Sequence, residues 1–248
     1  MATPVVEIRG LGKRYRLSHV HRPDNLKAYV KGLIGIGRSS GRENDEQFWA
    51  LQDINLTLEE GECLALVGKN GSGKSTLLKI LSRIVPPTMG SICVRGKVTS
   101  LLEVGTGFHP ELTGRENIFL NGAMLGCPER EMKGRFDSVV DFSGVERFLD
   151  MPVKHYSSGM YVRLAYAVAA HVDAKVFVID EVLAVGDAEF QAKCIAHIGS
   201  LPSRGSSTIF VSHDEVLVRR LASHIVTLDA GRCIGYERND SADRSGSR

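Results

Sequence analysis

The stretch Gly68-Lys-Asn-Gly-Ser-Gly-Lys-Ser-Thr76 decides the fold of this 248-residue chain. It matches the pattern G-x-x-x-x-G-K-[ST], in which a glycine-rich backbone wraps around phosphate groups. The apolar run Cys63–Val67 before it predicts a buried strand, and residues 76–83 after it predict a helix. A strand, a glycine loop and a helix in this order can hold a nucleoside triphosphate, because loop N–H groups and the positive helix end face the anion.

Two side chains of this glycine loop have predicted chemical roles. Lys74 is expected to reach the β- and γ-phosphates, and Ser75 is expected to offer its hydroxyl to Mg²⁺. The alternative is a glycine-rich turn that binds nothing, and the register of Gly, Lys and Ser between a strand and a helix argues against it. The predicted nucleotide-binding residues are Gly68, Lys69, Asn70, Gly71, Ser72, Gly73, Lys74, Ser75 and Thr76.

A second apolar run, Val176-Phe-Val-Ile179, ends in the two carboxylates Asp180 and Glu181. Parallel strands of open α/β sheets carry their ligands at the carboxyl ends. Asp180 is therefore predicted to hold the Mg²⁺ shell, and Glu181 to polarise an attacking water. Hydrolysis of a triphosphate requires both tasks. Without the glycine loop upstream, two acids that simply end a strand would be an equally good interpretation.

A third feature is Tyr156-Ser-Ser-Gly-Met160, which precedes a helix predicted to run to His171. Its small residues and free N–H groups form a second helix N-terminus that can face an anion. The alternative interpretation is an ordinary serine N-cap.

The remaining pattern predicts an α/β domain into which a mostly helical segment, residues 107–157, is inserted. A capping box at Thr113 and Glu116 opens one of its helices. Residues 238–248 are polar and Ser-rich, and a flexible tail is expected there. The strands are expected at 5–8, 54–58, 63–67, 91–95, 98–103, 176–179, 208–211, 225–228 and 233–236.

Residues 17–48 form a basic segment that also carries an apolar stripe at helical spacing. Two interpretations stay open. The segment is either a solvated basic loop or a helix that rests against a membrane protein or lipid headgroups.

Composition excludes several classes of protein. The net charge of +2 does not indicate a nucleic-acid partner. Five cysteines without a C-x-x-C pair argue against a disulfide framework or a zinc site. No stretch approaches the ~18 apolar residues of a membrane span, and the N-terminus has no apolar signal core. If the protein works at a membrane, another chain is expected to cross it.

Together these features resemble the ATP-binding subunit of ABC transporters over residues 3–236. The resemblance implies an α/β P-loop NTPase core of the ABC ATPase type, with an inserted helical subdomain at 107–157 and an antiparallel β subdomain, in a nucleotide-binding domain at 1–237. It implies that Tyr15 stacks on adenine, that Asp187 is the D-loop aspartate and that His213 touches the γ-phosphate. The resemblance also implies that Ser157, Ser158 and Gly159 are the signature residues that contact the ATP of the other protomer.

The departures from the family pattern are informative. Tyr156, Ser158 and Met160 replace Leu, Gly and Gln of the signature, and the Q-loop glutamine is missing where Glu103 stands. With the 17–48 insertion, these features look like the branch that exports polysaccharides such as O-antigen, capsular glycans and teichoic acids. The resemblance implies a homodimer around two ATP and Mg²⁺, an integral membrane permease partner, a lipid-linked polysaccharide substrate, and a peripheral place on the cytoplasmic side of the inner membrane.

Three other functions are compatible with a P-loop. An ABC ATPase could power transport of a different substrate. A soluble ABC ATPase acting on DNA or ribosomes usually carries coiled-coil insertions or two cassettes, and neither is present. A small-molecule kinase would lack the helix after 157–159 and the segment around His213. Which polysaccharide moves, and in which direction, is not encoded in any motif of this chain.

Overall fold

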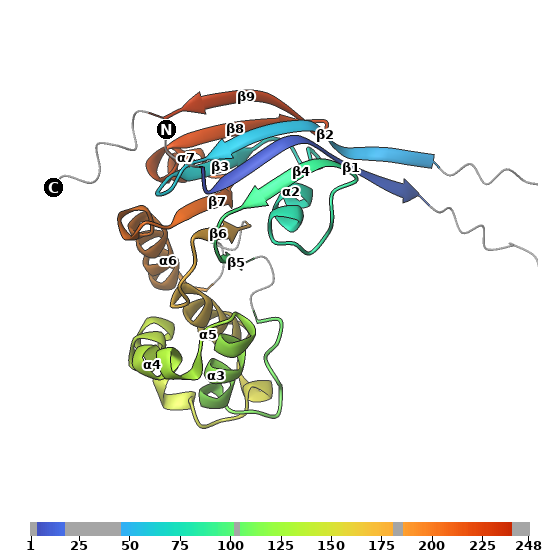
Figure 1. Ribbon diagram of the computed structural model, residues 1–248. Coiled ribbons are helices and arrows are strands. Elements are labelled where there is room, and N and C mark those ends of the chain that lie inside the picture. Colours follow the sequence, from blue (N-terminus) through green and yellow to red (C-terminus); the bar gives the residue numbers. More distant parts are fainter. Residues whose placement is uncertain (1–3, 18–45, 102–104, 181–185, 240–248) are drawn as a thin grey trace, which may run out of the picture.

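A six-stranded sheet carries the glycine loop and most of the core (Figure 1). The computed structural model describes residues 4–17, 46–101, 105–180 and 186–239. The strands of this sheet are β3 (Cys63–Val67), β5 (Val98–Ser100), β6 (Val176–Ile179), β7 (Ser207–Val211), β8 (His224–Asp229) and β9 (Arg232–Arg238). Their spatial order is β5-β6-β7-β3-β8-β9, with parallel pairing except between β8 and β9.

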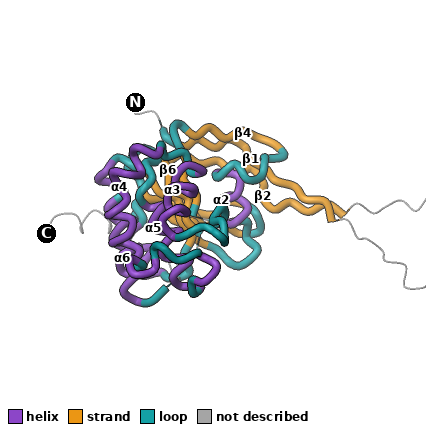
Figure 2. The backbone as a smooth tube through the Cα atoms, turned by 90° about the horizontal axis from the view of Figure 1, so that it is seen from below, coloured by secondary structure: helices purple, strands orange, loops and turns teal. Residues whose placement is uncertain are grey.

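A second, antiparallel sheet packs against the first and contains β1 (Val6–Leu17), β2 (Glu46–Leu58) and β4 (Met89–Val94) in the order β2-β1-β4. The predicted strands at 5–8 and 54–58 are therefore too short. β1 and β2 pair from Val6 and Leu58 out to Leu17 and Glu46, and they extend past the body of the protein as a two-stranded ribbon (Figure 2).

This pairing also corrects the boundaries of the predicted insertion at 17–48. Position 17 and positions 46–48 belong to the paired strands. Residues 18–45 lie outside the described part of the chain. The pairing partner is far away in sequence, so the local pattern does not reveal how long the two strands are.

The helices connect the parallel strands and cover the sheet, since parallel neighbours need crossover connections. No helix in the described ranges is long and apolar enough to cross a bilayer. The helices are α2 (Lys74–Leu81), α3 (Gly114–Met124), α4 (Glu129–Ser143), α5 (Ser158–Ala170), α6 (Ala188–Ser200) and α7 (Glu215–Leu221), with short 3₁₀ turns η1 (Glu146–Phe148), η2 (Val153–His155) and η4 (Pro202–Arg204).

Three apolar clusters hold these layers together. The first fills the space between the two sheets and includes the apolar face of α2. The second lies on the opposite face of the six-stranded sheet, under α5, α6 and α7. The third is the interior of the helical subdomain, built by α3, α4 and the first half of α5. Helix α5 contributes to the second and third clusters, so it joins the helical subdomain to the sheet. The predicted α/β core with an antiparallel part is confirmed.

The helical subdomain begins with the predicted capping box. The Thr113 hydroxyl accepts from the Glu116 N–H, and the Glu116 carboxylate accepts from the Thr113 N–H at 2.8 Å. Figure 1 shows α3, α4 and α5 together below the sheets.

Of the predicted tail at 238–248, the structure describes Arg238 and Asn239, which belong to the folded domain, and residues 240–248 lie outside the described part of the chain. β9 continues to Arg238, and Asn239 is buried. The Asn239 amide donates to the carbonyls of Arg219 (2.8 Å) and Ala222 (2.7 Å), which ties the chain to α7. These carbonyls lie at the end of a helix about 20 positions earlier in the sequence, so composition alone does not reveal that Asn239 is anchored there.

Candidate functional site

The candidate site forms where three parallel strands end side by side. Leu66 of β3 pairs with Val211 of β7, and Ile179 of β6 pairs with Phe210 of β7. The glycine loop, the segment after β7 and Asp180 therefore all leave the same edge of the sheet. Sheet order brings these groups together, although the glycine loop is more than 100 positions in sequence from both Asp180 and the segment after β7. The carboxyl edge of a parallel sheet is the usual ligand site of open α/β folds.

Two glycines of the loop are required by close backbone packing. Gly68 has φ +146°, and a Cβ there would lie 2.2 Å from the Leu228 carbonyl oxygen. Gly73 has φ +106°, and a Cβ there would lie 2.7 Å from the Ala50 carbonyl oxygen. Only glycine accepts both the positive φ and the contact. The loop is thus pressed against β2 and the β8–β9 turn.

The Lys74 side chain is held across the mouth of the loop. Its Nζ donates to the carbonyls of Gly68 (2.6 Å) and Lys69 (2.9 Å), and the residue is only 7% exposed. These partners are neutral carbonyls, so the ammonium keeps its full charge for an anion at the loop. The sequence-predicted cation and the loop residues lie together.

The hydroxyl groups of the loop also suit a bound triphosphate. Ser72 is 2% exposed, and its Oγ has no hydrogen-bond partner among the described residues. A buried hydroxyl without a partner costs free energy of about 1–3 kcal/mol unless a ligand supplies one. Ser75, in contrast, is exposed in the first turn of α2, where it is accessible to a metal ion. Ser75 and Asp180 are the residues that would hold Mg²⁺.

An aromatic pair stands next to the loop on the β1–β2 ribbon. Tyr15 pairs with Phe48 across the strands, and their rings stack at 5.9 Å with an interplanar angle of 24°. Tyr15 is half-buried, so it is not an ordinary core residue. Since Ala50, two positions from Phe48, touches Gly73, the pair lies near the phosphate loop. Sequence reasoning missed Phe48, because its partnership depends on strand register.

We expect Tyr15→Ala to weaken ATP binding about tenfold, because an aromatic platform under a base is worth ~1–3 kcal/mol. Phe48→Ala is expected to cost about threefold, since Phe48 would act by orienting the Tyr15 ring. Fluorescence titration with a labelled ATP analogue measures both. Tyr15→Phe is the matched control and should keep the wild-type affinity. Equal affinity of Tyr15→Ala and wild type would rule out the adenine platform.

His213 lies beside the glycine loop, as the sequence predicted for a γ-phosphate contact. It follows β7 and is exposed, and it lines a cavity of about 270 Å³ together with Gly68. The turn after it is fixed by Asp214, whose carboxylate accepts from the N–H groups of Val216 (2.9 Å) and Leu217 (3.1 Å). The structure thus brings His213 to the loop, while Glu181 and Glu103 lie outside the described residues.

The Ser157–Gly159 turn is built as a helix N-terminus. Ser157 is the N-cap of α5, and its Oγ accepts from the Met160 N–H at 3.2 Å. Tyr156, which replaces the family leucine, donates its hydroxyl to the Phe148 carbonyl at 2.8 Å and so anchors the turn to the helical subdomain. Ser158 is exposed. Within one chain this turn packs on the helical subdomain, whereas the glycine loop packs on the sheets (Figure 1).

An ion pair that sequence reasoning missed links this helix to the D-loop position. Asp187 is the N-cap of α6, where its Oδ1 accepts from the Phe190 N–H at 2.9 Å. Its other oxygen, Oδ2, lies 3.3 Å from Nη1 of Arg163, one turn into α5. The pair joins the Ser157–Gly159 helix to the segment that follows Asp180. Helices α5 and α6 are brought together by the tertiary fold, so the spacing of Arg163 and Asp187 in the sequence does not predict their contact.

Comparisons with known proteins agree on one family. The sequence model described as ABC transporter matches residues 51–184. The O-antigen export system ATP-binding protein RfbB of Klebsiella pneumoniae is 40% identical over 92% of both chains. The teichoic acids export ATP-binding protein TagH of Listeria monocytogenes is 36% identical over 89% of this chain and 66% of its own. The cassette MJ0796, in a dimeric structure bound to ADP and Pi, superposes with a TM-score of 0.72 at 22% identity, covering 94% of this chain and 98% of its own.

Proposed function

This chain belongs to the ABC transporter family, and from that premise we propose that it is the ATP-hydrolysing subunit that powers polysaccharide export through a separate membrane permease. The chain binds ATP and is an ATPase, as its family is. The similarity of this chain to both O-antigen and teichoic acid export subunits supports a polysaccharide as the substrate class. A lipid-linked polymer and a peripheral place on the cytoplasmic face of the inner membrane complete the proposal.

Each residue at the carboxyl edge has a separate role in the proposed ATP hydrolysis. Lys74 and the loop N–H groups bind and orient the triphosphate, and the unpaired Ser72 hydroxyl gains an acceptor there. Bound Mg²⁺, held by Ser75 and Asp180, would neutralise phosphate charge. Glu181 would orient the attacking water, and His213 would contact the terminal phosphate from the neighbouring strand.

A second copy of the chain completes this site in the proposal. Ser157–Gly159 offers a helix N-terminus that packs away from the glycine loop of its own chain. If two chains face each other, this turn meets the partner's triphosphate, which then receives positive charge from both sides. Hydrolysis removes the shared anion and lets the pair separate, so each cycle yields a mechanical movement.

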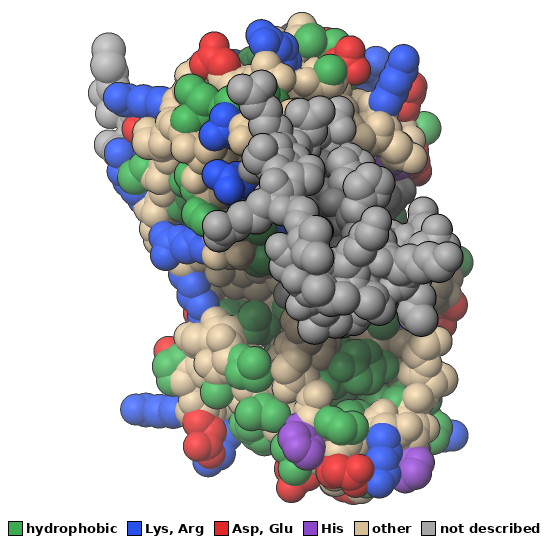
Figure 3. Space-filling view, turned by 90° about the vertical axis from the view of Figure 1, so that its right-hand side faces the viewer, with side chains coloured by type: hydrophobic (Ala, Val, Ile, Leu, Met, Phe, Trp, Pro, Cys, Tyr) green, Lys and Arg blue, Asp and Glu red, His purple; other side chains and the backbone are tan. Residues whose placement is uncertain are grey.

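A groove on the helical side that exposes two large apolar side chains suits a permease. Ile84 and Met124 are 44% and 62% exposed, and both line a groove of about 270 Å³ with Gly105 and Ala165. Figure 3 shows hydrophobic side chains gathered on the lower half of one face, the half that holds the helical subdomain. Tyr161 of α5 donates to the Gly105 carbonyl at 2.7 Å, so the groove touches the helix that begins at Ser158.

The dimeric arrangement is tested by crosslinking. Asn70 and Ser158 are both exposed, so Asn70→Cys and Ser158→Cys are combined in a Cys93→Ser background that lacks the exposed native thiol. A non-hydrolysable ATP analogue with Mg²⁺ is expected to produce a disulfide between two chains on mild oxidation. Pairing Asn70→Cys with Ser203→Cys, which is also exposed, is the control and should stay uncrosslinked. Absence of a nucleotide-dependent crosslink would contradict the paired site.

Export itself is tested by deleting the gene in its source bacterium. Surface polysaccharide should disappear, and lipid-linked polymer should accumulate inside the cell. Wild-type protein should restore the surface polymer, and the Lys74→Ala protein should not. Unchanged surface polysaccharide would favour transport of a different substrate or a soluble ABC ATPase.

A further inference from the structure

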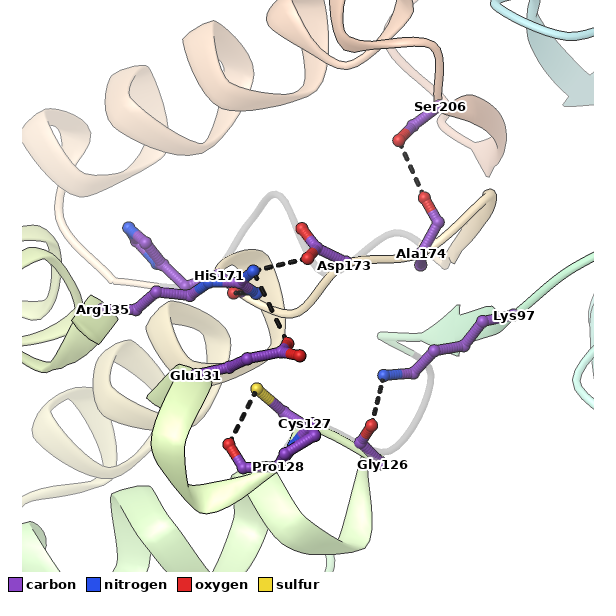
Figure 4. Close-up of polar contacts among 10 residues, drawn as sticks. All are labelled: Lys97, Gly126, Cys127, Pro128, Glu131, Arg135, His171, Asp173, Ala174 and Ser206. Carbon is purple, nitrogen blue, oxygen red and sulfur yellow. Dashed lines mark hydrogen bonds and ion pairs between the residues drawn. The ribbon is translucent and has the colours of Figure 1, made fainter. Parts of the chain in front are cut away.

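A cavity of about 520 Å³ lies at the opposite edge of the six-stranded sheet, where β5, β6 and β7 begin. Its walls come from the turn before β5, helix α4, the end of α5 and the turn before β7 (Figure 4). The volume falls in the range of about 300–1,000 Å³ found for small-molecule sites. Because the glycine loop leaves the carboxyl edge, this cavity is separate from the nucleotide site.

The cavity lining carries four cations, and two carboxylates outside the lining, Glu131 and Glu60, pair with Arg135 and Lys175. Asp173 is the one acidic residue among those that line the cavity. Burial lowers the pKa of His171, the hydrogen bond with the Ala167 carbonyl raises it, and the positive charges of Arg204 and Arg135 lower it further. The lining cations are Lys97, Arg135, Lys175 and Arg204.

Two of these cations are neutralised by neighbours. Arg135 donates to the His171 carbonyl at 2.7 Å and pairs with Asp173, while Lys175 pairs with Glu60. Both pairs involve acids that are more than half exposed, so they bring little stability of their own. A ligand can therefore compete for these cations at low cost.

The other two cations lack an acidic partner in the described ranges. Lys97 donates to the neutral carbonyl of Gly126 at 2.9 Å, which holds its Nζ at the cavity wall (Figure 4). Arg204 is exposed at the end of η4 and forms no ion pair with a described residue. Like charges that line one cavity repel each other, and a bound anion would relieve this repulsion.

The frame that carries the cations is fixed by backbone hydrogen bonds. The Lys175 N–H donates to the Lys97 carbonyl (2.9 Å), and the Ser207 N–H donates to the Lys175 carbonyl (2.8 Å). The Ser206 hydroxyl donates to the Ala174 carbonyl at 2.8 Å. These groups are already paired, so binding would depend on the side-chain cations. The backbone of the site is preorganised, which reduces the entropy cost of binding.

We propose that this cavity binds a phosphate-bearing anion, with Lys97 and Arg204 as its direct ligands. A phosphate group carries a charge of about −1.5 to −2 and three acceptor oxygens, which matches a cavity lined by several cations better than a single carboxylate does. The apolar floor accepts a small organic group next to the phosphate. The floor consists of Ala170, Val172, Ala174, Phe177 and Leu201. The phosphate belongs either to a soluble ester or to a lipid headgroup.

Calorimetry with pyrophosphate and glucose 1-phosphate tests the soluble source. The full chain is first saturated with Mg²⁺ and a non-hydrolysable ATP analogue, so that the glycine loop is filled. Wild type should bind with one site per chain, and Lys97→Gln and Arg204→Gln should each weaken binding about tenfold, the effect of losing one charge-assisted contact. Arg130→Gln is the matched control, because Arg130 is exposed on α4 outside the cavity. Citrate that binds as tightly as pyrophosphate would overturn the assignment to phosphate.

Vesicle flotation tests the lipid source. Phosphatidylcholine vesicles with and without phosphatidic acid are compared for wild type, Arg204→Gln and Arg130→Gln. Flotation that requires both phosphatidic acid and Arg204 assigns the site to a lipid headgroup, whereas Arg204-dependent calorimetric binding alone assigns it to a soluble ester. Absence of Arg204-dependent binding in both assays overturns the proposal. A Lys74→Ala protein should retain this binding, so failure of the nucleotide site and failure of this site are distinguishable.

Discussion

Lys74→Ala is expected to lower ATP hydrolysis by at least about 100-fold, the usual cost of removing one preorganised group that stabilises developing charge. The Lys74 ammonium is held at 2.6 Å and 2.9 Å from two loop carbonyls. It is therefore positioned before ATP arrives and loses little entropy on binding. Alanine removes both the charge and the contact that holds the mouth of the loop. A phosphate-release assay at saturating ATP measures the effect.

A loss caused by misfolding must be separated from a loss of charge. Lys79→Ala is the matched control, because Lys79 lies in the last turn of the same helix and is exposed. It should hydrolyse ATP at the wild-type rate. The two variants should also melt within a few degrees of wild type, since Leu77, Leu78, Ile80 and Leu81 of the helix stay buried. Normal hydrolysis by Lys74→Ala would remove this lysine from the site.

The second large effect is predicted for Glu181→Gln, which should slow hydrolysis about 100- to 10,000-fold while ATP binding persists. The prediction rests on sequence order, because Glu181 directly follows Asp180 at the carboxyl edge, although Glu181 itself lies outside the described residues. A glutamine has nearly the shape of the glutamate but cannot take the proton of a water. If ATP joins two chains, the variant should accumulate as an ATP-bound dimer.

Size-exclusion chromatography with light scattering measures this dimer in the presence of ATP and Mg²⁺. Glu189→Gln is the control, because Glu189 is an exposed residue in the first turn of α6 that pairs with Lys193. It should remain active and should not accumulate as a dimer. A Glu181→Gln protein that turns over ATP normally would assign the water-orienting role to another residue. A Glu181→Gln protein that hydrolyses ATP slowly but stays monomeric would contradict the proposed ATP-joined dimer and would leave the role of Glu181 intact.

Local sequence patterns predicted the parts of the site that depend on short stretches of chain. The strand, loop and helix around Gly68–Thr76 follow from their own residues, and the Thr113–Glu116 capping box is confirmed at its predicted place. The predicted lengths of the strands β1 and β2 were wrong, because pairing between these two strands, which are distant in sequence, extends both of them. The stacking of Phe48 on Tyr15 could not be predicted for the same reason, because it depends on the register of the two strands.

The sequence by itself determined the chemistry of this protein: a cation and hydroxyls on a glycine loop, two carboxylates after an apolar strand, and a serine-glycine turn before a helix. Only the tertiary structure decided which of these groups meet. The sheet order β5-β6-β7-β3-β8-β9 is not the chain order, and it places Asp180 and His213 on the edge that carries Lys74. It also gathers Lys97 and Arg204 around the opposite edge. Burial of apolar strand faces selects that order, and burial is a property of the whole fold.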